Sequence, residues 1–329
     1  MTPAAKPSLS DLTANAHVVS IPLKHKFRGI EVREAMLIEG SAGWTEWSPF
    51  LEYEDEEAAV WLAAAIEYGY YELPKLITSQ VHINATLGAI KTKHIVEALE
   101  PFGDFKTVKV KVAEPGQTIV EDLYRVLRLR EFYPDVKIRI DANGGYSVQN
   151  AIEIAKEISI AGIDLEYFEQ PVKTIAEMAE VRLKLSRIGV KVAADESVRK
   201  VSDPLAVAQA NAADVLILKA QPLGGISSAL AISKEAGLPV TISSALETSV
   251  GISMGLHLAA ALEVESFDAG LGTVAMFEDD VCEEPFIAKD GLLFPNRAMP
   301  SPAKLEKLKA SDERQTWWLQ RLERCYRLI

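Results

Sequence analysis

The chain has 329 residues, of which 48% are hydrophobic and 25% charged, which is ample for a large buried core and two domains. Its formal net charge of −12 argues against nucleic acid or an anionic membrane as a partner. Two cysteines are too few for a disulfide framework, and the sequence contains neither a leader-like apolar segment nor a run of about 18 apolar residues. We therefore expect a cytoplasmic protein.

The first part of the chain is predicted to fold apart from the middle. Residues 17–50 contain three β-like runs, and residues 54–73 carry apolar side chains at three- and four-residue steps, the period of an amphipathic helix. After about residue 295 the chain continues as a basic, tryptophan-containing tail. We expect this tail to pack back on the N-terminal part.

From Val81 onward, short apolar strands alternate with amphipathic helices. The predicted strands lie at 82–86, 106–112, 136–141, 164–168, 190–195, 214–219, 239–243 and 266–270, and the helices include 120–133 and 147–159. Eight strands with intervening helices favour a closed parallel barrel. The same alternation also suits a doubly wound open sheet, but no glycine fingerprint follows the first strand.

Six charged residues occupy equivalent places, each at the end of a predicted strand. They are Lys109, Lys111, Asp141, Glu169, Asp195 and Lys219. The three acids and the last lysine follow one another at intervals of 28, 26 and 24 residues, about the length of one strand–helix unit. In a parallel barrel the C-terminal ends of successive strands meet at one mouth, where barrel enzymes carry out their chemistry. The spacing therefore predicts that the six side chains converge.

The three acids are predicted to hold a divalent metal ion, Mg²⁺ or Mn²⁺. Carboxylate oxygens are the ligands that Mg²⁺ prefers, and the ion usually keeps places for water and substrate. A single acid at the end of a strand is more often a helix cap or a solvated loop residue. Three acids at equivalent positions of successive units favour a metal site.

Lysines border the predicted metal site. Lys109 and Lys111 are two residues apart on one strand, so both side chains point to the same face. Inside a barrel such a pair is costly to bury unless the site uses it, although a strand with one exposed face shows the same alternation. Lys219 alone also fits a strand-end lysine whose head reaches water. Arg139 lies two residues before Asp141, so it faces inward, where it would pair with a substrate carboxylate.

This set of side chains suits the removal of a proton from the carbon next to a carboxylate. Such a proton is very weakly acidic, and a divalent metal stabilises the ene-diolate that forms when it leaves. A lysine in a cationic, partly desolvated site has a lowered pKa and serves as the base.

Several short motifs resemble the muconate lactonizing enzyme subgroup of the enolase superfamily, in which a lysine base with Mg²⁺ is the known pattern. They are K-x-K at 109–111, D-A-N at 141–143, E-Q-P at 169–171 and D-E-S at 195–197, with Lys219 following. Three more are similar to o-succinylbenzoate synthases, especially the short actinobacterial kind: F-R-G-I at 27–30, R-I-D-A-N at 139–143 and S-S-A-L-E-T-S-V-G at 243–251. The resemblance covers nearly the whole chain.

This resemblance implies a modified TIM barrel of the (β/α)7β type with an α+β capping domain. The implied division places the N-terminal part of the capping domain at 1–80, the catalytic barrel at 81–292 and the C-terminal tail, packing on the capping domain, at 293–329. The implied reaction is a syn dehydration of 2-succinyl-6-hydroxy-2,4-cyclohexadiene-1-carboxylate to 2-succinylbenzoate, a step of menaquinone synthesis. The implied substrate is thus a small carboxylate. Oligomeric state stays open, and a monomer is compatible with the sequence.

The resemblance also assigns a role to each side chain. Asp141, Glu169 and Asp195 would hold the metal ion. Lys111 would take the proton and return it to the departing hydroxide, Lys219 would stabilise the intermediate or act as the opposite acid/base, and Lys109 would tune Lys111. The implied substrate-binding residues are Arg139, Asn143, Ser243 and Ser244.

Other functions remain compatible with the same residues. N-succinylamino acid racemization, muconate cycloisomerization and dipeptide epimerization would all use this site. Dipeptide epimerases usually carry Asp-x-Asp after the eighth strand, where this chain has Asp268-Ala269-Gly270, which counts against that activity. An aldolase that forms a Schiff base on Lys219 and a barrel that only binds ligand are more distant alternatives.

Overall fold

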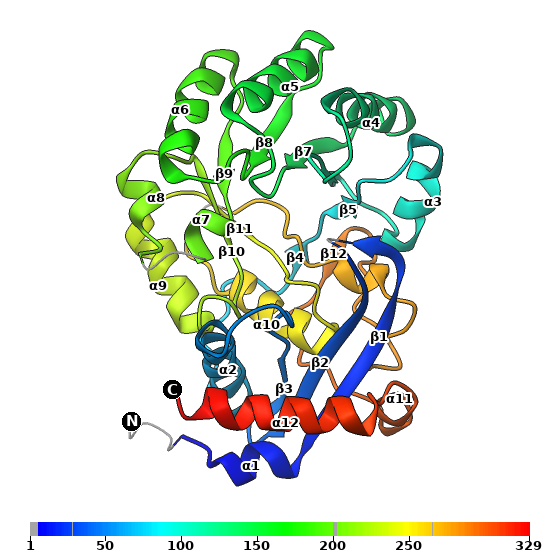
Figure 1. Ribbon diagram of the computed structural model, residues 1–329, viewed down its shortest axis with the longest axis vertical. Coiled ribbons are helices and arrows are strands. Elements are labelled where there is room, and N and C mark those ends of the chain that lie inside the picture. The colour runs from blue at the N-terminus through cyan, green and yellow to red at the C-terminus, as the bar shows by residue number, and fades with distance from the viewer. Residues whose placement is uncertain (1–5, 28, 200–202, 265) are drawn as a thin grey trace.

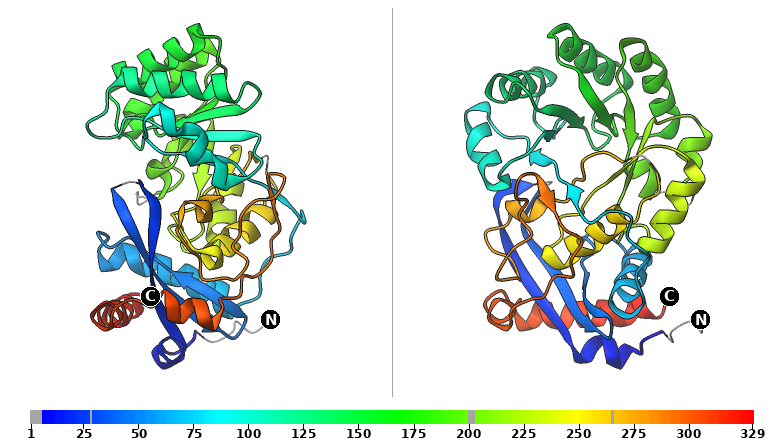
Figure 2. Two further views of the ribbon diagram at one scale, coloured as in Figure 1. Left: turned by 90° about the vertical axis from the view of Figure 1, so that its right-hand side faces the viewer. Right: turned by 180° about the vertical axis from the view of Figure 1, so that it is seen from behind.

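The structure is a computed structural model that describes residues 6–27, 29–199, 203–264 and 266–329. Arg28, in the F-R-G-I motif, therefore lies outside the described residues. Figure 1 shows two parts, an upper part in which helices surround a curved parallel sheet and a lower part built on a long antiparallel hairpin. Figure 2 shows the same two parts from the side and from behind.

The lower part combines the start and the end of the chain. Its strands are β1 (Ala16–Phe27), β2 (Ile30–Gly40) and β3 (Gly43–Trp47), and its helices are α1 (Leu9–Ala14), α2 (Asp55–Tyr70), α11 (Pro302–Lys307) and α12 (Asp312–Tyr326). The strands form an antiparallel sheet in the order β1-β2-β3. The three predicted β-like runs and the helix predicted at 54–73 thus correspond to β1, β2, β3 and α2.

Helix α2 follows from its sequence. Three acids, at 55–57, fill its first turn, where the helix dipole favours negative charge. Trp61 and Leu62 are fully buried, and Trp61 packs on the aromatic side chains of Phe50 and Tyr53 that precede the helix. The helix therefore buries its apolar face against the antiparallel sheet.

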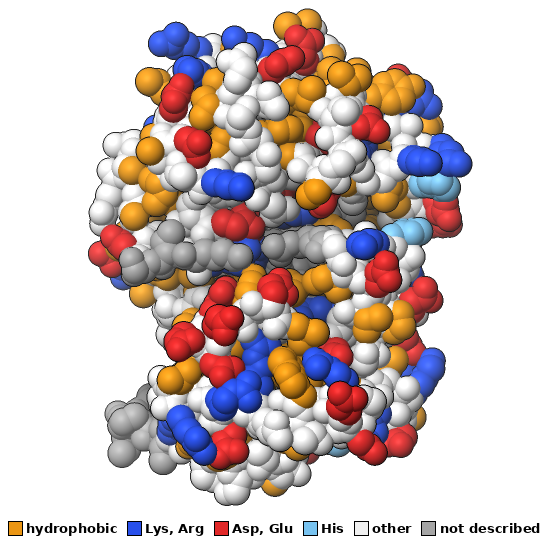
Figure 3. Space-filling model, in the orientation of Figure 1, with side chains coloured by type: hydrophobic (Ala, Val, Ile, Leu, Met, Phe, Trp, Pro, Cys, Tyr) orange, Lys and Arg blue, Asp and Glu red, His pale blue; other side chains and the backbone are white. Residues whose placement is uncertain are grey.

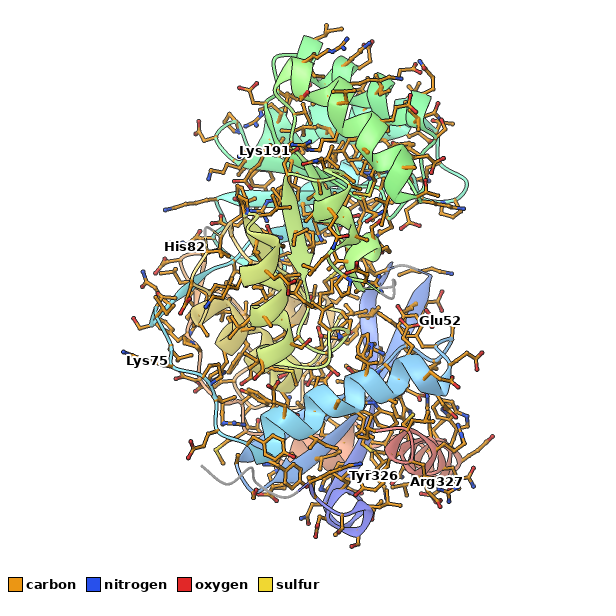
Figure 4. All side chains as sticks on the ribbon, turned by 90° about the vertical axis from the view of Figure 1, so that its left-hand side faces the viewer. Glu52, Lys75, His82, Lys191, Tyr326 and Arg327 are labelled. Atoms are coloured by element: carbon orange, nitrogen blue, oxygen red, sulfur yellow. The ribbon has the colours of Figure 1, made fainter. Side chains whose placement is uncertain are left out.

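The C-terminal tail contacts this sheet. The backbone N–H of Ala310 donates to the Val18 carbonyl at 2.9 Å. The guanidinium of Arg314 and the indole of Trp318 both donate to the carboxylate of Glu34 on β2. In Figure 4, Tyr326 and Arg327 lie at the end of α12. The hydroxyl of Tyr326 donates to the Pro7 carbonyl, and Nζ of Lys6 donates to the Ile329 carbonyl, so this end of the chain is joined to Lys6 and Pro7.

The upper part is the parallel sheet with its helices. The strands are β4 (Val81–His82), β5 (Ala85–Leu87), β6 (Thr107–Lys111), β7 (Lys137–Asp141), β8 (Leu165–Glu169), β9 (Val192–Ala194), β10 (Val215–Leu218), β11 (Val240–Ile242) and β12 (Leu292–Leu293). The helices are α3 (Ile95–Leu99), α4 (Ile119–Phe132), α5 (Val148–Ile160), α6 (Ile175–Leu185), α7 (Glu196–Arg199), α8 (Ala206–Gln209), α9 (Ile226–Ala236) and α10 (Ser249–Ala260). Four 3₁₀ turns are η1 (Thr92–His94), η2 (Glu100–Phe102), η3 (Ser186–Ile188) and η4 (Thr273–Met276).

Seven of these strands form one sheet in the order β11-β10-β9-β8-β7-β6-β5. The prediction of a strand at 266–270 is wrong, because this segment makes only isolated bridges. Those bridges nevertheless close the barrel, since Ala269 pairs with Ile83 on one side and Gly270 pairs with Ser243 on the other. The strand predicted at 82–86 is divided into β4 and β5, and β4 pairs with β12 rather than with the barrel sheet.

The helix limits agree with the sequence within one residue for α4 and α5. Thr118 and Glu121 form a reciprocal capping box at the start of α4, and Ser147 caps α5. A large core lies between these helices and the outer face of the sheet, and it includes Val108 and Val110 of β6. Since side chains alternate along a strand, the residues between the valines point into the barrel.

Candidate active site

The register of the parallel strands brings the predicted charged residues to one level. Lys111 pairs with Asp141 across β6 and β7, and Asp141 pairs with Glu169 across β7 and β8. Asp195 directly follows β9, and Lys219 directly follows β10. The three acids are at most 1% exposed and the three lysines 5–7% exposed. In Figure 3, charged side chains of both signs border the waist between barrel and capping part, on the face that the figure shows.

Lys109 lies between two of the acids. Its Nζ is 3.2 Å from both carboxylate oxygens of Glu169 and 3.4 Å from Oδ2 of Asp141. This lysine comes from one level deeper in the strand, and its long side chain extends upward to the acids. It thereby neutralises carboxylates that would otherwise repel each other in a buried site.

Lys111 reaches the mouth of the barrel. Its Nζ is 2.5 Å from Oδ2 of Asp141 and 2.6 Å from Oδ1 of Asn143. The same atom lies 5.6 Å from the ring centroid of Phe27, at the tip of the β1–β2 hairpin of the capping part. Lys111 is therefore covered by a residue far away in the sequence.

Lys219 lies on the opposite side of the barrel from Lys111. Strands β6 and β10 are four places apart among the seven strands and the closing segment 266–270, which is half the circumference. Nζ of Lys219 donates to Oδ2 of Asp195 at 2.6 Å, and Oδ1 of the same acid accepts from Arg199 at 3.0 Å. The sequence reasoning missed Arg199, although its position four residues after Asp195 on α7 is a pairing signal.

Burial and neighbouring charge shift the pKa values in different directions. Burial raises the pKa of Glu169 to about 7, and the charge of Asp141 acts in the same direction. Burial by itself would lower the pKa of Lys109, but attraction to these two acids outweighs it and raises the pKa. Burial lowers the pKa of Lys219 despite its contact with Asp195. The two lysines differ because Lys109 faces two carboxylates at close range.

A cavity opens between these residues and the capping part. Its lining includes Lys109, Lys111, Asp141, Asn143, Lys219, Ser243, Ser244, Ala245, Leu246, Gly270, Thr273, Thr86, Phe27 and Phe50. Both predicted serines therefore lie at the cavity, and Ser244 shares a hydrogen bond of 2.8 Å with Thr273. The sequence reasoning missed Phe50 and Leu246, because both are uncharged apolar residues, although Leu246 lies within the motif at 243–251.

The structure places Arg139 below the cavity rather than in its lining. Its guanidinium donates to the carboxylate of Glu166, to the side chain of Asn84 and to the Asp268 carbonyl, and it stacks 4.7 Å from the ring of Tyr167. The side chain therefore joins strands β7 and β8 to the segment that closes the barrel. Inward orientation was predicted correctly, but the level in the barrel keeps Arg139 away from the cavity.

The donor set fits a hard divalent cation in kind. Three buried carboxylates offer six oxygens at adjoining strand ends. Oε2 of Glu196 is a further buried oxygen, and it has no hydrogen-bond partner among the described residues. Within the described residues, no three acidic, histidine or cysteine side chains are already spaced as a cation cage, because the lysine ammonium groups occupy the contacts. Cation binding would exchange carboxylate–ammonium contacts for carboxylate–cation contacts.

Family models match both parts of the chain. Residues 18–69 match the enolase N-terminal domain-like family, and residues 92–298 match the enolase C-terminal domain-like family. Fold and site thus define an enolase-like protein with a modified (β/α)7β barrel and an α+β capping domain.

Relatives identify the family more closely. The chain is 46% identical to the o-succinylbenzoate synthase of Mycolicibacterium smegmatis over 98% of both chains. It is 47% identical to that of Mycobacterium marinum, over 98% of this chain and 96% of the relative. The chain belongs to the o-succinylbenzoate synthase family of the enolase superfamily.

Solved structures of related proteins share the fold. The muconate lactonizing enzyme of Pseudomonas fluorescens superposes with a TM-score of 0.76 at 19% identity, over 90% of this chain and 98% of the other. The L-Ala-D/L-Glu epimerase of Bacillus subtilis gives a TM-score of 0.73 at 22% identity, over 87% of this chain and 96% of the other.

Among the described residues, no helix is long and apolar enough to cross a membrane.

Proposed function

We propose that this protein converts 2-succinyl-6-hydroxy-2,4-cyclohexadiene-1-carboxylate to 2-succinylbenzoate by loss of water, in menaquinone synthesis. The observation that carries this proposal is the identity of 46–47% to o-succinylbenzoate synthases over 98% of this chain. The cavity supports it, since three lysines, the carboxylate of Asp141 and two serines line it. The proposed location is the cytoplasm.

Lys111 is proposed to move the proton. In its neutral form, Nζ takes the proton from the substrate carbon next to the carboxylate, while Asn143 holds the nitrogen in place through a contact of 2.6 Å. The resulting ammonium group then gives the same proton to the departing hydroxide, which leaves as water. One lysine on one face thus suffices for a syn elimination.

The other residues hold charge. Asp141, Glu169 and Asp195 are the proposed ligands of Mg²⁺ or Mn²⁺, which when bound polarises the substrate carboxylate. Lys219, fixed by Asp195, places a second positive charge on the opposite side of the cavity. Lys109 offsets the negative charge between the acids. Ser243 and Ser244 are the proposed contacts of the succinyl group.

Formation of 2-succinylbenzoate by the purified protein tests the proposal directly. The reaction is followed with added Mg²⁺, with added Mn²⁺ and after exhaustive treatment with EDTA. We expect turnover with at least one cation and its loss after chelation. Full activity after chelation would contradict the assignment of the three acids as metal ligands.

N-succinylamino acid racemization is the second candidate, because Lys111 and Lys219 lie on opposite sides of the cavity. Racemization needs a base on one face and an acid on the other, whereas the elimination needs only one lysine. We expect the Lys219→Arg variant to keep some dehydration activity. It should lose any exchange of the α proton of N-succinyl amino acids for deuterium in D₂O. If wild-type kcat/KM for racemization exceeds that for dehydration by about tenfold, racemization is the principal activity.

A further inference from the structure

A buried arginine of the capping part lies directly behind the cavity wall. Arg33, on β2, is 3% exposed, and in the described part of the chain it forms no ion pair within 4.0 Å. Its donors point instead to backbone carbonyl groups. Nε donates to Leu246 at 3.0 Å and a terminal nitrogen to Ala245 at 3.4 Å, both in the loop after β11. The remaining donors bind the carbonyls of Glu34 and Ser48 in the capping part.

Three cavity-lining residues contact this one guanidinium. Ala245 and Leu246 accept its hydrogen bonds, and the ring of Phe50 stacks over it with its centroid 4.4 Å away. All three line the cavity together with Lys111 and Lys219. The contact joins the two parts of the molecule, because Phe50 follows the capping sheet and the loop belongs to the barrel.

The backbone of Leu246 depends on such a contact. Its φ is +65°, a conformation that a branched L side chain rarely adopts without support from its surroundings. The Leu246 carbonyl accepts a hydrogen bond of 3.0 Å from Nε of Arg33. A planar guanidinium holds several acceptors in fixed directions, whereas an ammonium group on a flexible chain does not.

We propose that Arg33 is a positioning residue that sets the cavity wall formed by Phe50, Ala245 and Leu246. The identity of the substrate used to test it rests on the proposed function. None of the three wall residues is a proposed metal ligand or a proton-transferring lysine, so we place the wall against the part of the substrate that does not react. Arg33 therefore governs how tightly and how selectively substrate binds, and leaves the proton transfer itself unchanged.

The test compares Arg33→Lys with a matched control, Arg297→Lys. Arg297 also donates to a backbone carbonyl of the capping part, that of Tyr68 at 2.9 Å, and stacks 4.2 Å from the Tyr68 ring, but it does not line the cavity. We expect Arg33→Lys to raise KM by about tenfold or more while kcat changes less than about threefold, the pattern of lost substrate binding. The dissociation constant of 2-succinylbenzoate should rise in parallel. Arg297→Lys should leave both values within about twofold of wild type.

Two double variants separate positioning from general destabilisation. Glycine adopts positive φ at no steric cost, whereas alanine does not. Adding Arg33→Lys to Leu246→Gly should therefore change KM less than about threefold, and adding it to Leu246→Ala should still raise KM about tenfold. If Arg33→Lys alone does not fold, recovery of folding in the Leu246→Gly background but not in the Leu246→Ala background decides the question.

Equal KM changes in the glycine and alanine backgrounds would overturn the proposal, as would equal effects of Arg33→Lys and Arg297→Lys. A failure of the proposed function is seen separately, because the wild-type protein then forms no 2-succinylbenzoate. In that event the same variants are compared with N-succinyl amino acids in D₂O.

Discussion

The barrel mouth and the junction with the capping part are both buried polar clusters, yet they are built in different ways. At the mouth, charged side chains face one another, as Lys111 faces Asp141 at 2.5 Å. At the junction, charged side chains face backbone groups. Arg33 donates to four carbonyls, and Oε2 of Glu46 accepts from the backbone N–H groups of Thr248 and Gly251 at 3.1 and 3.0 Å.

The difference separates chemistry from shape. Side chains paired with each other can exchange partners, so the acids and lysines of the mouth are able to bind a cation, release a proton or accept one. Charged side chains bound to backbone groups fix the course of the chain, and their hydrogen bonds leave no position for a reacting group. We therefore expect substitutions at the mouth to act mainly on turnover, and those at the junction to act on stability and substrate binding.

The largest expected effect is that of Lys111→Ala on turnover. Removing the base should lower kcat by about 10⁴-fold, the upper end of the range for general acid–base catalysis, because this lysine both takes and returns the proton. Steady-state formation of 2-succinylbenzoate measures it. Lys109→Ala is the control from the same strand, and a larger loss in that variant would show that the two lysines have been assigned in the wrong order.

Glu169→Gln should lower turnover by more than about 100-fold, the upper range for partners that only orient metal ligands. The amide keeps the shape of the side chain but loses the negative charge that favours a cation. Isothermal titration with Mg²⁺ and thermal unfolding are measured beside activity. Unchanged cation affinity in a folded variant would exclude Glu169 as a ligand.

Arg139→Met should destabilise the fold rather than weaken substrate binding. Breaking a buried ion pair costs about 3–5 kcal/mol, and we expect the lower end because Lys137 still lies 3.2 Å from Glu166. Urea unfolding measures the loss in free energy, and KM should stay close to the wild-type value. A large rise in KM in a stable variant would show that Arg139 binds substrate after all.

The smallest effect is a pH dependence at the junction. Burial, with the nearby charge of Glu247, raises the pKa of Glu46 to about 7 from an ordinary value of 4.5. The folded protein then holds this proton more tightly than the unfolded chain, so the contribution to the free energy of unfolding is lost as pH rises from about 4.5 to 7.

Glu46→Gln removes this dependence, and its amide oxygen still accepts from the α10 N-terminus. Relative to wild type, the variant should gain up to about 3 kcal/mol in free energy of unfolding between pH 4.5 and 8. Denaturant unfolding at several pH values measures the gain. If the difference in free energy of unfolding between the two proteins does not change with pH, the pKa of Glu46 is not raised.

Much of the barrel mouth follows from the sequence alone. Lys111, Asp141 and Glu169 each end an apolar strand, and in a parallel barrel strand ends meet at one level, so their convergence needed no coordinates. The limits of α4 and α5 were likewise predictable, because capping residues at 118 and 147 act through local hydrogen bonds. Motifs at the strand ends also carried the resemblance to the enolase superfamily.

Only the tertiary structure decided which inward-facing residue reaches the cavity and how the barrel closes. Arg139 and Asp141 point to the same face of β7, but Arg139 is bound by Glu166 and Asn84 one level lower. The sequence indicates 266–270 as the closing segment, but the structure closes the barrel there through isolated bridges and not through a continuous strand. Arg33 and Leu246 are 213 residues apart, and a contact between an arginine and a distant backbone carbonyl leaves no periodicity or motif in a sequence. Local patterns record where strands and helices lie, whereas the shape of the cavity depends on contacts between parts of the chain that meet only after folding.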